Sequence, residues 1–307
     1  MSKAVNQLVS VVIPLYNAEK YIAAALDSVF TQSYTPLEVV VVDDGSKDKS
    51  VEIVNSLQSD TIKLVQQENL GPAAARNRGV QEARGRWIAF LDADDIWQAN
   101  KIETQLAVMG PNKWAYCDSE FMGGPNDGRC DSELNQKYQG MVLEQLTCSN
   151  FIGTSGVIVE RSVFLEIGGF DGGLRSIQDW DLWLRIASEY PVSYADAALV
   201  RYRVHSESTS RSARKTLPNH KRVIEKTFAA GGAAARYPHL RVQTLANSYS
   251  ICSHIAEEEG DLNFSLKCAL HSSLCLKSSL SAWLRFTKLA VKWCLNITGM
   301  RKAQSPS

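Results

Sequence analysis

The sequence lacks the features that mark several large classes of protein. It has no uninterrupted apolar stretch of the roughly 18 residues that suggest a membrane-spanning helix. No signal-peptide core precedes the short apolar run that ends at Pro14, so we expect a cytoplasmic protein, which can still rest at the inner face of the cell membrane. The seven cysteines form no CxxC pair and no His-Cys metal spacing, and their odd number indicates reduced thiols.

The formal net charge of the whole chain is zero, but its two parts carry opposite charges. Residues 1–210 carry 18 Lys+Arg against 28 Asp+Glu, and residues 211–307 carry 15 against 5. This polarity suggests two parts that face different partners. The acidic part can hold a cation, and the basic part can face phosphates or an anionic bilayer. A length of 307 residues suits one large domain with a smaller appendage.

Strand and helix patterns alternate over the first hundred residues. Short β-branched runs predict strands, and apolar residues at helical spacing predict the helices between them. The predicted strands are 9–13, 37–42, 62–65 and 87–91, and the predicted helices are 20–32, 46–57 and 72–84. This order predicts an α/β fold, with a mostly parallel, Rossmann-like sheet that helices cover on both faces.

The remainder of the chain divides into a mixed region and a helical one. Residues 113–202 combine strand-like pieces with glycine-rich turns, whereas the chain after residue 214 is mostly helical in pattern. Serine and basic residues replace the apolar pattern near 211–216. We therefore predict two domains, 1–212 and a helical C-terminal region, 213–307, which associates with a membrane or a partner.

Polar clusters follow three of the predicted strands. They are Pro14-Leu-Tyr-Asn17, Asp43-Asp44 and Asp92-Ala-Asp-Asp95. In an open parallel sheet, ligands bind beyond the carboxyl ends of the strands. The three clusters therefore predict a binding site at one edge of the sheet.

Asp92, Asp94 and Asp95 stand within four positions directly after the fourth strand. Such carboxylates repel one another unless a cation or hydrogen-bond donors compensate. Mg²⁺ and Mn²⁺ prefer oxygen ligands and accept phosphate oxygens as co-ligands. The alternative is a helix N-cap before Ile96, and the three aspartates alone fit both interpretations equally. The other strand-end clusters favour the metal.

The segment Gly71-Pro-Ala-Ala-Ala-Arg76-Asn77-Arg78-Gly79 predicts a helix N-terminus with two guanidinium groups in its early turns. Backbone amides and the helix dipole attract anions there, and arginine adds bidentate reach. A phosphate or a nucleotide base nearby would explain this composition. An ordinary amphipathic helix with solvated arginines is the alternative, and the segment alone favours it.

Taken together and in order, these motifs resemble the family-two glycosyltransferases. The resemblance covers roughly residues 8–210, and its strength comes from the number of motifs in the right order, since each one alone is weak. They are Val-Ile-Pro-Leu-Tyr-Asn17, Val-Val-Asp43-Asp44-Gly-Ser46, Asn69-Leu-Gly-Pro-Ala-Ala-Ala-Arg76-Asn77, Phe-Leu-Asp92-Ala-Asp94-Asp95, Gly168-Gly-Phe-Asp171, Gln178-Asp179-Trp-Asp-Leu-Trp-Leu-Arg185 and Tyr202-Arg-Val-His205.

The resemblance implies a GT-A fold and an inverting hexosyl or N-acetylhexosaminyl transfer from a nucleotide-diphosphate sugar, commonly a UDP-sugar. It implies that Asp179 is the general base, that Asp94 and His205 assist a divalent Mn²⁺ or Mg²⁺, and that no nucleic acid is bound. The nucleotide-binding positions it implies are Pro14, Tyr16, Asp43, Asp44, Arg76 and Asp92, with Asp92 at the ribose.

The chain departs from the family where Gln178 replaces a glutamate that often precedes the base. Because Asp179 is retained, we expect activity to survive this change. Asp181 is expected to be structural, as an acidic residue in the first turn of a helix. Trp180 is a candidate acceptor contact, since an exposed tryptophan can stack on a sugar, and Trp183 is expected in the core.

The C-terminal segment 281–302 combines cations with large apolar side chains. A helical wheel places Ser281, Arg285, Lys288, Lys292 and Asn296 in one stripe, while Trp, Phe, Leu and Val fill the rest. This composition is typical of a helix in a membrane interface. A helix docked on protein is the equal alternative. Under the first interpretation, the acceptor is lipid-linked or a growing surface polysaccharide or glycolipid.

Two other functions are compatible with parts of the pattern. A non-catalytic module that binds nucleotide sugars or polysaccharide would keep the fold, but a decayed site would tend to lose Asp92, Asp94 and Asp179. A nucleotidyltransferase would share the sheet and the metal. It would carry a glycine-rich basic loop after the first strand, and Pro14-Leu-Tyr-Asn17 is not such a loop.

Overall fold

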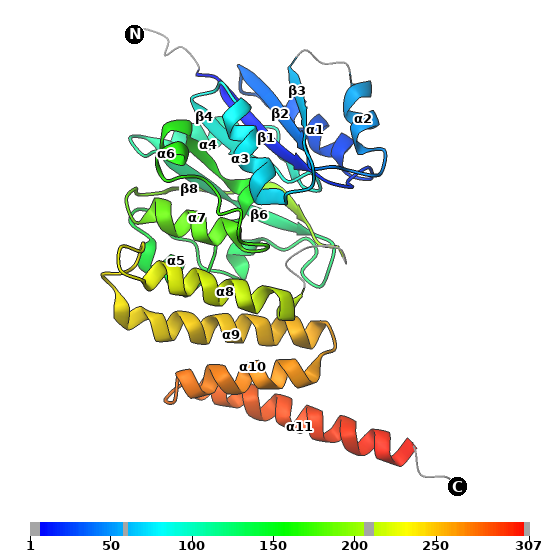
Figure 1. Ribbon diagram of the computed structural model, residues 1–307, viewed down its shortest axis with the longest axis vertical. Coiled ribbons are helices and arrows are strands. Elements are labelled where there is room, and N and C mark those ends of the chain that lie inside the picture. The colour runs from blue at the N-terminus through cyan, green and yellow to red at the C-terminus, as the bar shows by residue number, and fades with distance from the viewer. Residues whose placement is uncertain (1–6, 58–60, 206–211, 304–307) are drawn as a thin grey trace. The chain divides into compact units, whose positions relative to one another are not determined.

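The computed structural model describes residues 7–57, 61–205 and 212–303, with side chains as far as Leu295. The chain forms two compact units. Unit 1 comprises Met1–Leu143 and Asn150–His205, and unit 2 comprises Glu144–Ser149 and Ser206–Ser307. Each unit is described below by itself (Figure 1).

Unit 1 is built on one eight-stranded sheet with the strand order β3-β2-β1-β4-β7-β6-β8-β5. β3, β2, β1 and β4 run parallel, as do β6 and β8, whereas β7 is antiparallel to both of its neighbours and β5 is antiparallel to β8. The predicted mostly parallel α/β sheet is confirmed for its first half. The strands are β1 Val9–Leu15, β2 Leu37–Asp43, β3 Ile62–Gln66, β4 Trp87–Phe90, β5 Ile96–Trp97, β6 Trp114–Met122, β7 Ile158–Glu160 and β8 Ser193–Arg203.

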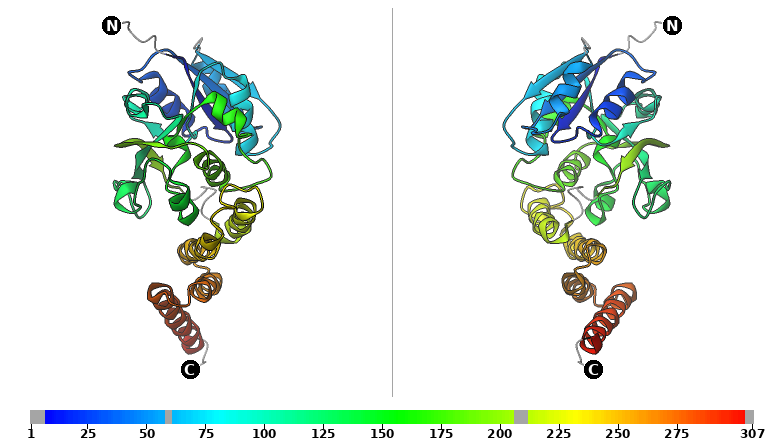
Figure 2. Two further views of the ribbon diagram at one scale, coloured as in Figure 1. Left: turned by 90° about the vertical axis from the view of Figure 1, so that its left-hand side faces the viewer. Right: turned by 90° about the vertical axis from the view of Figure 1, so that its right-hand side faces the viewer.

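Helices cover both faces of this sheet, as Figure 2 shows. Val11 and Ile13 of β1 face the side where Leu26 lies in the apolar core. On the opposite side, Val12 packs against Gly79. A Cβ atom added to Gly79 would lie only 2.4 Å from the Val12 side chain. The first face is covered by α1 Ile22–Phe30, α2 Ser50–Ser56 and α4 Lys101–Met109, and the second by α3 Pro72–Glu82, α6 Arg161–Glu166 and α7 Gln178–Ala187.

The register of the parallel strands brings the predicted polar clusters to one edge. Leu15 pairs with Asp43, and Val12 pairs with Phe90, so β1, β2 and β4 all end on the same side of the sheet. The Asp44 amide donates to the Leu15 carbonyl at 2.8 Å, which holds the first two loops together. The segment after Phe90 carries the three aspartates beyond this edge.

Short elements complete unit 1, and helices make up unit 2. Unit 1 contains the 3₁₀ turns η1 Asp131–Glu133 and η2 Thr154–Gly156. Most of α5 Leu143–Cys148 belongs to unit 2, where Asn247 donates to the Cys148 carbonyl at 2.9 Å. The other elements of unit 2 are α8 Ala213–Phe228, η4 Pro238–Leu240, α9 Arg241–Glu258, α10 Leu262–Cys275 and α11 Leu280–Ala303. Pro218 lies inside helix α8.

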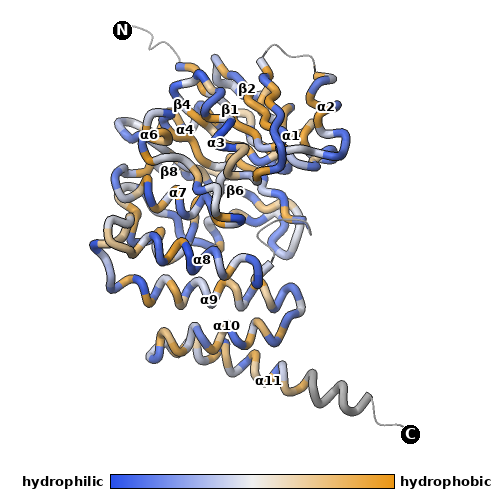
Figure 3. The backbone as a smooth tube through the Cα atoms, in the orientation of Figure 1, coloured by the Kyte–Doolittle hydropathy of each residue, from blue (hydrophilic) through white to orange (hydrophobic). Residues whose placement is uncertain are grey.

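Helix α11 uses part of its predicted basic stripe to pack within unit 2. Arg285 and Lys292 bind the Glu257 carboxylate of α9 at 3.2 and 2.8 Å, and Leu289 is buried. The opposite side of α11 leaves apolar side chains exposed, and Figure 3 shows the mixed hydropathy of this helix. Asn296 and the later residues of the stripe lie outside the described side chains. Within the described part of the chain, no helix is long and apolar enough to cross a membrane.

Candidate active site

Asp44 organises the loop that leads into α3. Its carboxylate accepts hydrogen bonds from the backbone amides of Leu70 and Gly71 at 2.9 and 2.8 Å, and from the Gln67 side chain at 2.8 Å. Asp43 is equally buried, at 3% exposure, and its carboxylate binds the turn that follows β2. Buried carboxylates need such donors. The two aspartates therefore fix the loops at the end of β2 and the entry into α3.

Tyr16 presents half of its surface to solvent at the end of β1, and Pro14 before it is half-buried. Asn17 then adopts a left-handed conformation, with φ of 49°, which asparagine tolerates better than most residues. Its amide donates to the Ser46 hydroxyl at 3.0 Å, and its side-chain oxygen accepts from the Lys47 amide at 2.8 Å. The loops after β1 and β2 thus form one continuous wall, with the Tyr16 ring exposed on it.

Arg76 joins α3 to the segment after β4. Its side chain is 8% exposed, its Nη2 binds the Asp92 carboxylate at 2.5 Å, and its guanidinium lies over the Phe170 ring at 5.4 Å. Among the described residues, the buried Nε of Arg76 has no hydrogen-bond partner. A buried unpaired donor is unfavourable unless a ligand or water satisfies it. Arg76 therefore places a positive charge beside Asp92, while its Nε is enclosed by the protein.

Asp94 and His205 are 111 residues apart in sequence and in contact in the structure. His205 Nε2 lies 2.8 Å from the Asp94 carboxylate, and the two side chains are 21% and 31% exposed. The His205 ring stacks on Tyr21 with 5.4 Å between centroids. Burial and the neighbouring Asp92 raise the pKa of Asp94, although His205 opposes this shift. Asp94 and His205 are partly exposed, and the negative charge of Asp94 is poorly compensated, so the pair is suited to bind a cation.

Asp95 has a different role from its neighbours. It is 1% exposed, and its two carboxylate oxygens accept from the Ser155 hydroxyl at 2.5 Å and the Arg203 amide at 2.9 Å. Burial raises its pKa well above the ordinary value. The residues that follow form strand β5, and α4 begins only at Lys101, so the alternative of a helix N-cap at these aspartates is wrong. Asp95 instead ties the aspartate loop to β8, two residues before His205.

Asp179 lies in the first turn of α7, directly after a strained residue. Ile177 has a φ of 53°, which is unfavourable for a β-branched side chain and is found mostly at functional sites. Asn150 Nδ2 donates to the Asp179 carboxylate at 2.8 Å. Burial raises the pKa of Asp179, although the Trp180 amide, the Arg76 charge and the Asn150 bond each oppose the shift. A carboxylate with a raised pKa in such a place is suited to accept a proton.

Gln178, the residue that departs from the family pattern, makes a hydrogen bond that requires a side-chain amide. Gln178 is 6% exposed, and its side-chain amide donates to the Leu174 carbonyl at 3.1 Å. A glutamate carboxylate cannot make this bond, because it only accepts. Asp181 is also buried, and it binds Arg185 at 2.7 Å, as expected for a structural residue.

The acceptor contact predicted for Trp180 does not agree with the structure. Trp180 is 3% exposed, so its ring offers almost no surface on which a sugar could stack. Trp183 lies in the core, as predicted, where its ring stacks on Trp114 with 5.9 Å between centroids.

The structure brings two pairs of predicted site residues into contact, Arg76 with Asp92 and Asp94 with His205. Among residues 7–57, 61–205 and 212–303, no three His, Cys, Asp or Glu side chains converge to hold a metal. Three further residues of the site were not predicted from the sequence, namely Asn150, Ser155 and Tyr21, which contact Asp179, Asp95 and His205. None of the three belongs to a recognisable motif. Arg203 could have been found, since it lies inside the Tyr202-Arg-Val-His205 motif.

Comparison with known proteins assigns this arrangement to a family. Residues 10–160 match the model of Glycosyl transferase family 2. An uncharacterized glycosyltransferase of Rickettsia felis is 34% identical over 223 residues, which are 69% of this chain and 36% of that relative, so the chain spans about a third of its length. The Escherichia coli UDP-Glc:alpha-D-GlcNAc-diphosphoundecaprenol beta-1,3-glucosyltransferase WfgD is 33% identical over 218 residues, 69% of this chain and 83% of that relative.

Two solved structures show the same fold at low sequence identity. Staphylococcus aureus TarS 1–349 in complex with UDP-GlcNAc has a TM-score of 0.64 and 18% identity, over 92% of this chain and 79% of that one. The mannosyltransferase PcManGT of Pyrobaculum calidifontis in complex with GDP-Man and Mn²⁺ has a TM-score of 0.58 and 21% identity, over 94% and 85%. The predicted GT-A fold is thereby confirmed. The chain is a glycosyltransferase and belongs to glycosyl transferase family 2.

Proposed function

We propose that this glycosyltransferase inverts the anomeric centre of a UDP-sugar as it transfers the sugar to a hydroxyl group of a saccharide acceptor. The observation that carries the proposal is the position of Arg76, which binds Asp92 directly and acts on the pKa of Asp179 through its charge. The nucleotide side and the proton-accepting side of the site are therefore near neighbours. The UDP-glucose named for the E. coli relative and the UDP-GlcNAc bound to TarS support a uridine donor.

The nucleotide occupies the carboxyl edge of the sheet in this proposal. The exposed Tyr16 ring and Pro14 offer a surface for the base, with the buried Asp43 and Asp44 behind the loops that frame it. Asp92 accepts from the ribose hydroxyls. The Arg76 guanidinium supplies positive charge beside Asp92 for an anionic part of the donor sugar nucleotide.

A divalent cation fits the residues beside this edge. Asp94 and His205 offer one oxygen and one nitrogen ligand that already lie 2.8 Å apart and are partly open to solvent. Mn²⁺ accepts both types of ligand, and a catalytic metal site leaves positions for substrate phosphates and water. When bound there, the metal supplies positive charge for the diphosphate that leaves. Mn²⁺ in the complexed PcManGT structure supports this choice.

The chemical step needs one proton acceptor. The Asp179 carboxylate takes the proton of the acceptor hydroxyl while that oxygen forms a bond to the anomeric carbon. The bond from the anomeric carbon to the diphosphate oxygen breaks, and its electron pair leaves with UDP. Arg76 stays close to both carboxylates and balances the charge of Asp92 during the step.

A screen of nucleotide sugars tests the donor and the metal together. Binding to the native state raises the melting temperature. With Mn²⁺ present, we expect at least one UDP-sugar to raise the melting temperature and to be turned over with release of UDP. A chelator should remove most of the temperature shift and most of the UDP release. The proposal fails if no UDP-sugar changes the melting temperature of the folded protein with Mn²⁺.

We further propose that α11 rests on an anionic bilayer, where a lipid-linked acceptor would be found. The side of α11 that does not pack within unit 2 exposes Leu284, Val291 and Leu295 by 59%, 60% and 65%. Exposed Lys288 lies on the same side, and the sequence after Asp261 contains seven Lys+Arg and no acidic residue. Apolar anchors with this charge favour an anionic membrane surface over a protein partner. The diphosphoundecaprenol named for the E. coli relative supports an acceptor of this class.

Vesicle flotation tests the α11 proposal. We expect the protein to float with vesicles of phosphatidylcholine and phosphatidylglycerol, and the double variant Leu284→Glu/Val291→Glu to remain unbound, because two charges would be buried in the interface. Val242→Glu in α9 is the matched control, since Val242 is also exposed, at 53%, but lies on another helix. It should float like the parent. Equal flotation of the parent and the double variant would exclude α11 as the contact.

A further inference from the structure

Asn150 contacts the proposed base, Asp179, and hydrogen bonds fix the orientation of its side-chain amide. Its Nδ2 donates to the Asp179 carboxylate at 2.8 Å, while its Oδ1 accepts from the Ile152 amide at 3.4 Å. A backbone N–H only donates and an ionised carboxylate only accepts. Neither bond survives if the amide is turned over, so the loop that follows α5 presents a donor to Asp179.

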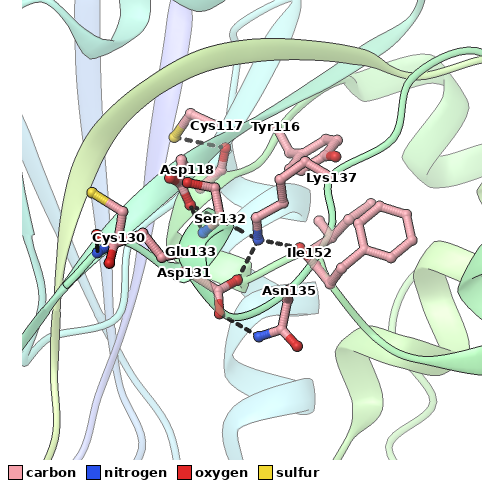
Figure 4. Close-up of polar contacts among 12 residues, drawn as sticks. Tyr116, Cys117, Asp118, Cys130, Asp131, Ser132, Glu133, Asn135, Lys137 and Ile152 are labelled. Carbon is pink, nitrogen blue, oxygen red and sulfur yellow. Dashed lines mark hydrogen bonds and ion pairs between the residues drawn. The ribbon is translucent and has the colours of Figure 1, made fainter. Parts of the chain in front are cut away.

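Lys137 holds the neighbouring residue of the same loop. Its ammonium group donates to the Phe151 carbonyl at 3.0 Å and forms ion pairs with Asp118, at 3.9 Å, and with Asp131. Figure 4 shows this group between the two carboxylates and the segment that contains Ile152. The Lys137 side chain is 6% exposed, and it donates to the Asp131 carboxylate and the Phe151 carbonyl, while the Asp118 carboxylate balances its charge. Phe151 is the residue directly after Asn150.

Aromatic packing restrains the same segment from a second side. The Phe151 ring lies 5.2 Å from the Tyr138 ring and 5.8 Å from the Tyr116 ring, measured between centroids. The Tyr116 hydroxyl donates to the Tyr138 carbonyl and accepts from the Tyr138 amide, at 2.7 and 2.9 Å. The backbone next to Asn150 is therefore restrained through both the carbonyl and the ring of Phe151.

We propose that Asn150 is a positioning residue that orients the Asp179 carboxylate for the acceptor hydroxyl, and that Lys137 keeps Asn150 in place through the Phe151 carbonyl. This inference rests on the proposed role of Asp179 as general base. One amide bond leaves other lone pairs of the carboxylate for the acceptor. It also favours the ionised form, which is the form that can accept a proton. The other groups that act on this carboxylate are the Trp180 amide and the charges of Arg76 and Asp92.

Carboxyl ¹³C NMR of aspartate-labelled protein measures the effect without catalysis. Asp179→Asn assigns the resonance. We expect Asn150→Ala to raise the pKa of Asp179 by about one unit, because a hydrogen bond to the charged form is lost. We expect the isosteric Asn150→Asp to raise it further, because two carboxylates then share one site. Asn112→Ala removes a half-buried amide that donates to Ser193 instead, and should leave the pKa unchanged.

The pH dependence of UDP release then links the pKa to the reaction. In Asn150→Ala, the acidic limb should move upward by the same amount as the NMR value, and a purely structural residue would not move it. If Asp179→Asn abolishes turnover but both Asn150 variants titrate like the parent, the positioning role is wrong and the base assignment stands. If Asp179→Asn retains turnover, the base assignment itself is wrong.

A double-mutant cycle tests the contribution of Lys137. Lys137→Met should raise the pKa of Asp179 in the parent, and should add no further shift to Asn150→Ala, because its effect passes through Asn150. A long-range effect of the lost charge would add equally in both backgrounds and would overturn this part of the proposal. If Lys137→Met does not fold, the triple variant with Asp118→Asn and Asp131→Asn removes all three charges and allows the same comparison.

Discussion

Asp179→Asn should lower kcat for sugar transfer by about a thousandfold, within the range that a general base contributes. Asparagine keeps the size of the side chain and the contact with Asn150, but it cannot accept the proton of the acceptor hydroxyl. The affinity for UDP should change little, because the proposed nucleotide contacts are made by Pro14, Tyr16 and Asp92 and not by Asp179. UDP release at saturating donor measures the first quantity, and calorimetric titration with UDP measures the second.

The parent enzyme should also show the pKa of this base in its pH profile. Burial raises the pKa of Asp179, and the base works only when ionised, so activity is lost as the pH falls through the raised value. The acidic limb should therefore lie above the ordinary range of an aspartate. Asp27→Asn, an exposed aspartate on α1, is the control and should behave like the parent. Turnover of Asp179→Asn within tenfold of the parent would contradict the assignment of Asp179 as the base.

Lys137→Met should destabilise unit 1 by about 3–5 kcal/mol, which is the usual result when one partner of a buried ion pair is removed. Asp118 and Asp131 would keep negative charges, with side chains 5% and 18% exposed, and no cation between them. Methionine fills a similar volume, so lost packing contributes little. Thermal and urea unfolding of the apo protein measure the change.

Lys113→Met provides a matched comparison for this prediction. Lys113 binds Glu160 at 2.6 Å, but its side chain is 41% exposed. The loss of the exposed Lys113 charge should cost about 0–1 kcal/mol, because Arg86 stays beside the Glu160 carboxylate at 3.5 Å. Similar losses in the two variants would show that the buried cluster in Figure 4 is no more important than a surface pair.

The first half of the sheet could be predicted from sequence because its signals are local. The strands Val9–Leu15, Leu37–Asp43 and Ile62–Gln66 are rich in β-branched residues, and each begins and ends within two residues of its predicted bounds. The helices between them fix a parallel order. The convergence of Asp43, Asp44 and Asp92 at one edge follows from that order alone.

The second half required contacts that no local pattern encodes. Strand β7 is three residues long and antiparallel to β4, and β6 pairs with β8 across a bulge. Asn150 contacts Asp179, which lies 29 residues further along the chain, and Lys137 pairs with Asp118, 19 residues before it. No sequence motif surrounds Asn150 or Lys137. The burial of Trp180 likewise depends on how α7 packs. A helical pattern identifies an apolar side chain without saying which surface covers it.

The most direct test of the account is the melting temperature of the apo protein with UDP, with and without Mn²⁺, compared between the parent and Asp94→Asn. In the parent, UDP with Mn²⁺ at about 100 times its Kd should stabilise the native state by about 2.7 kcal/mol. In Asp94→Asn, the part of the shift that depends on Mn²⁺ should disappear, while the part due to UDP alone should remain. An equal Mn²⁺-dependent shift in both proteins would contradict a metal held by Asp94 at this edge of the sheet.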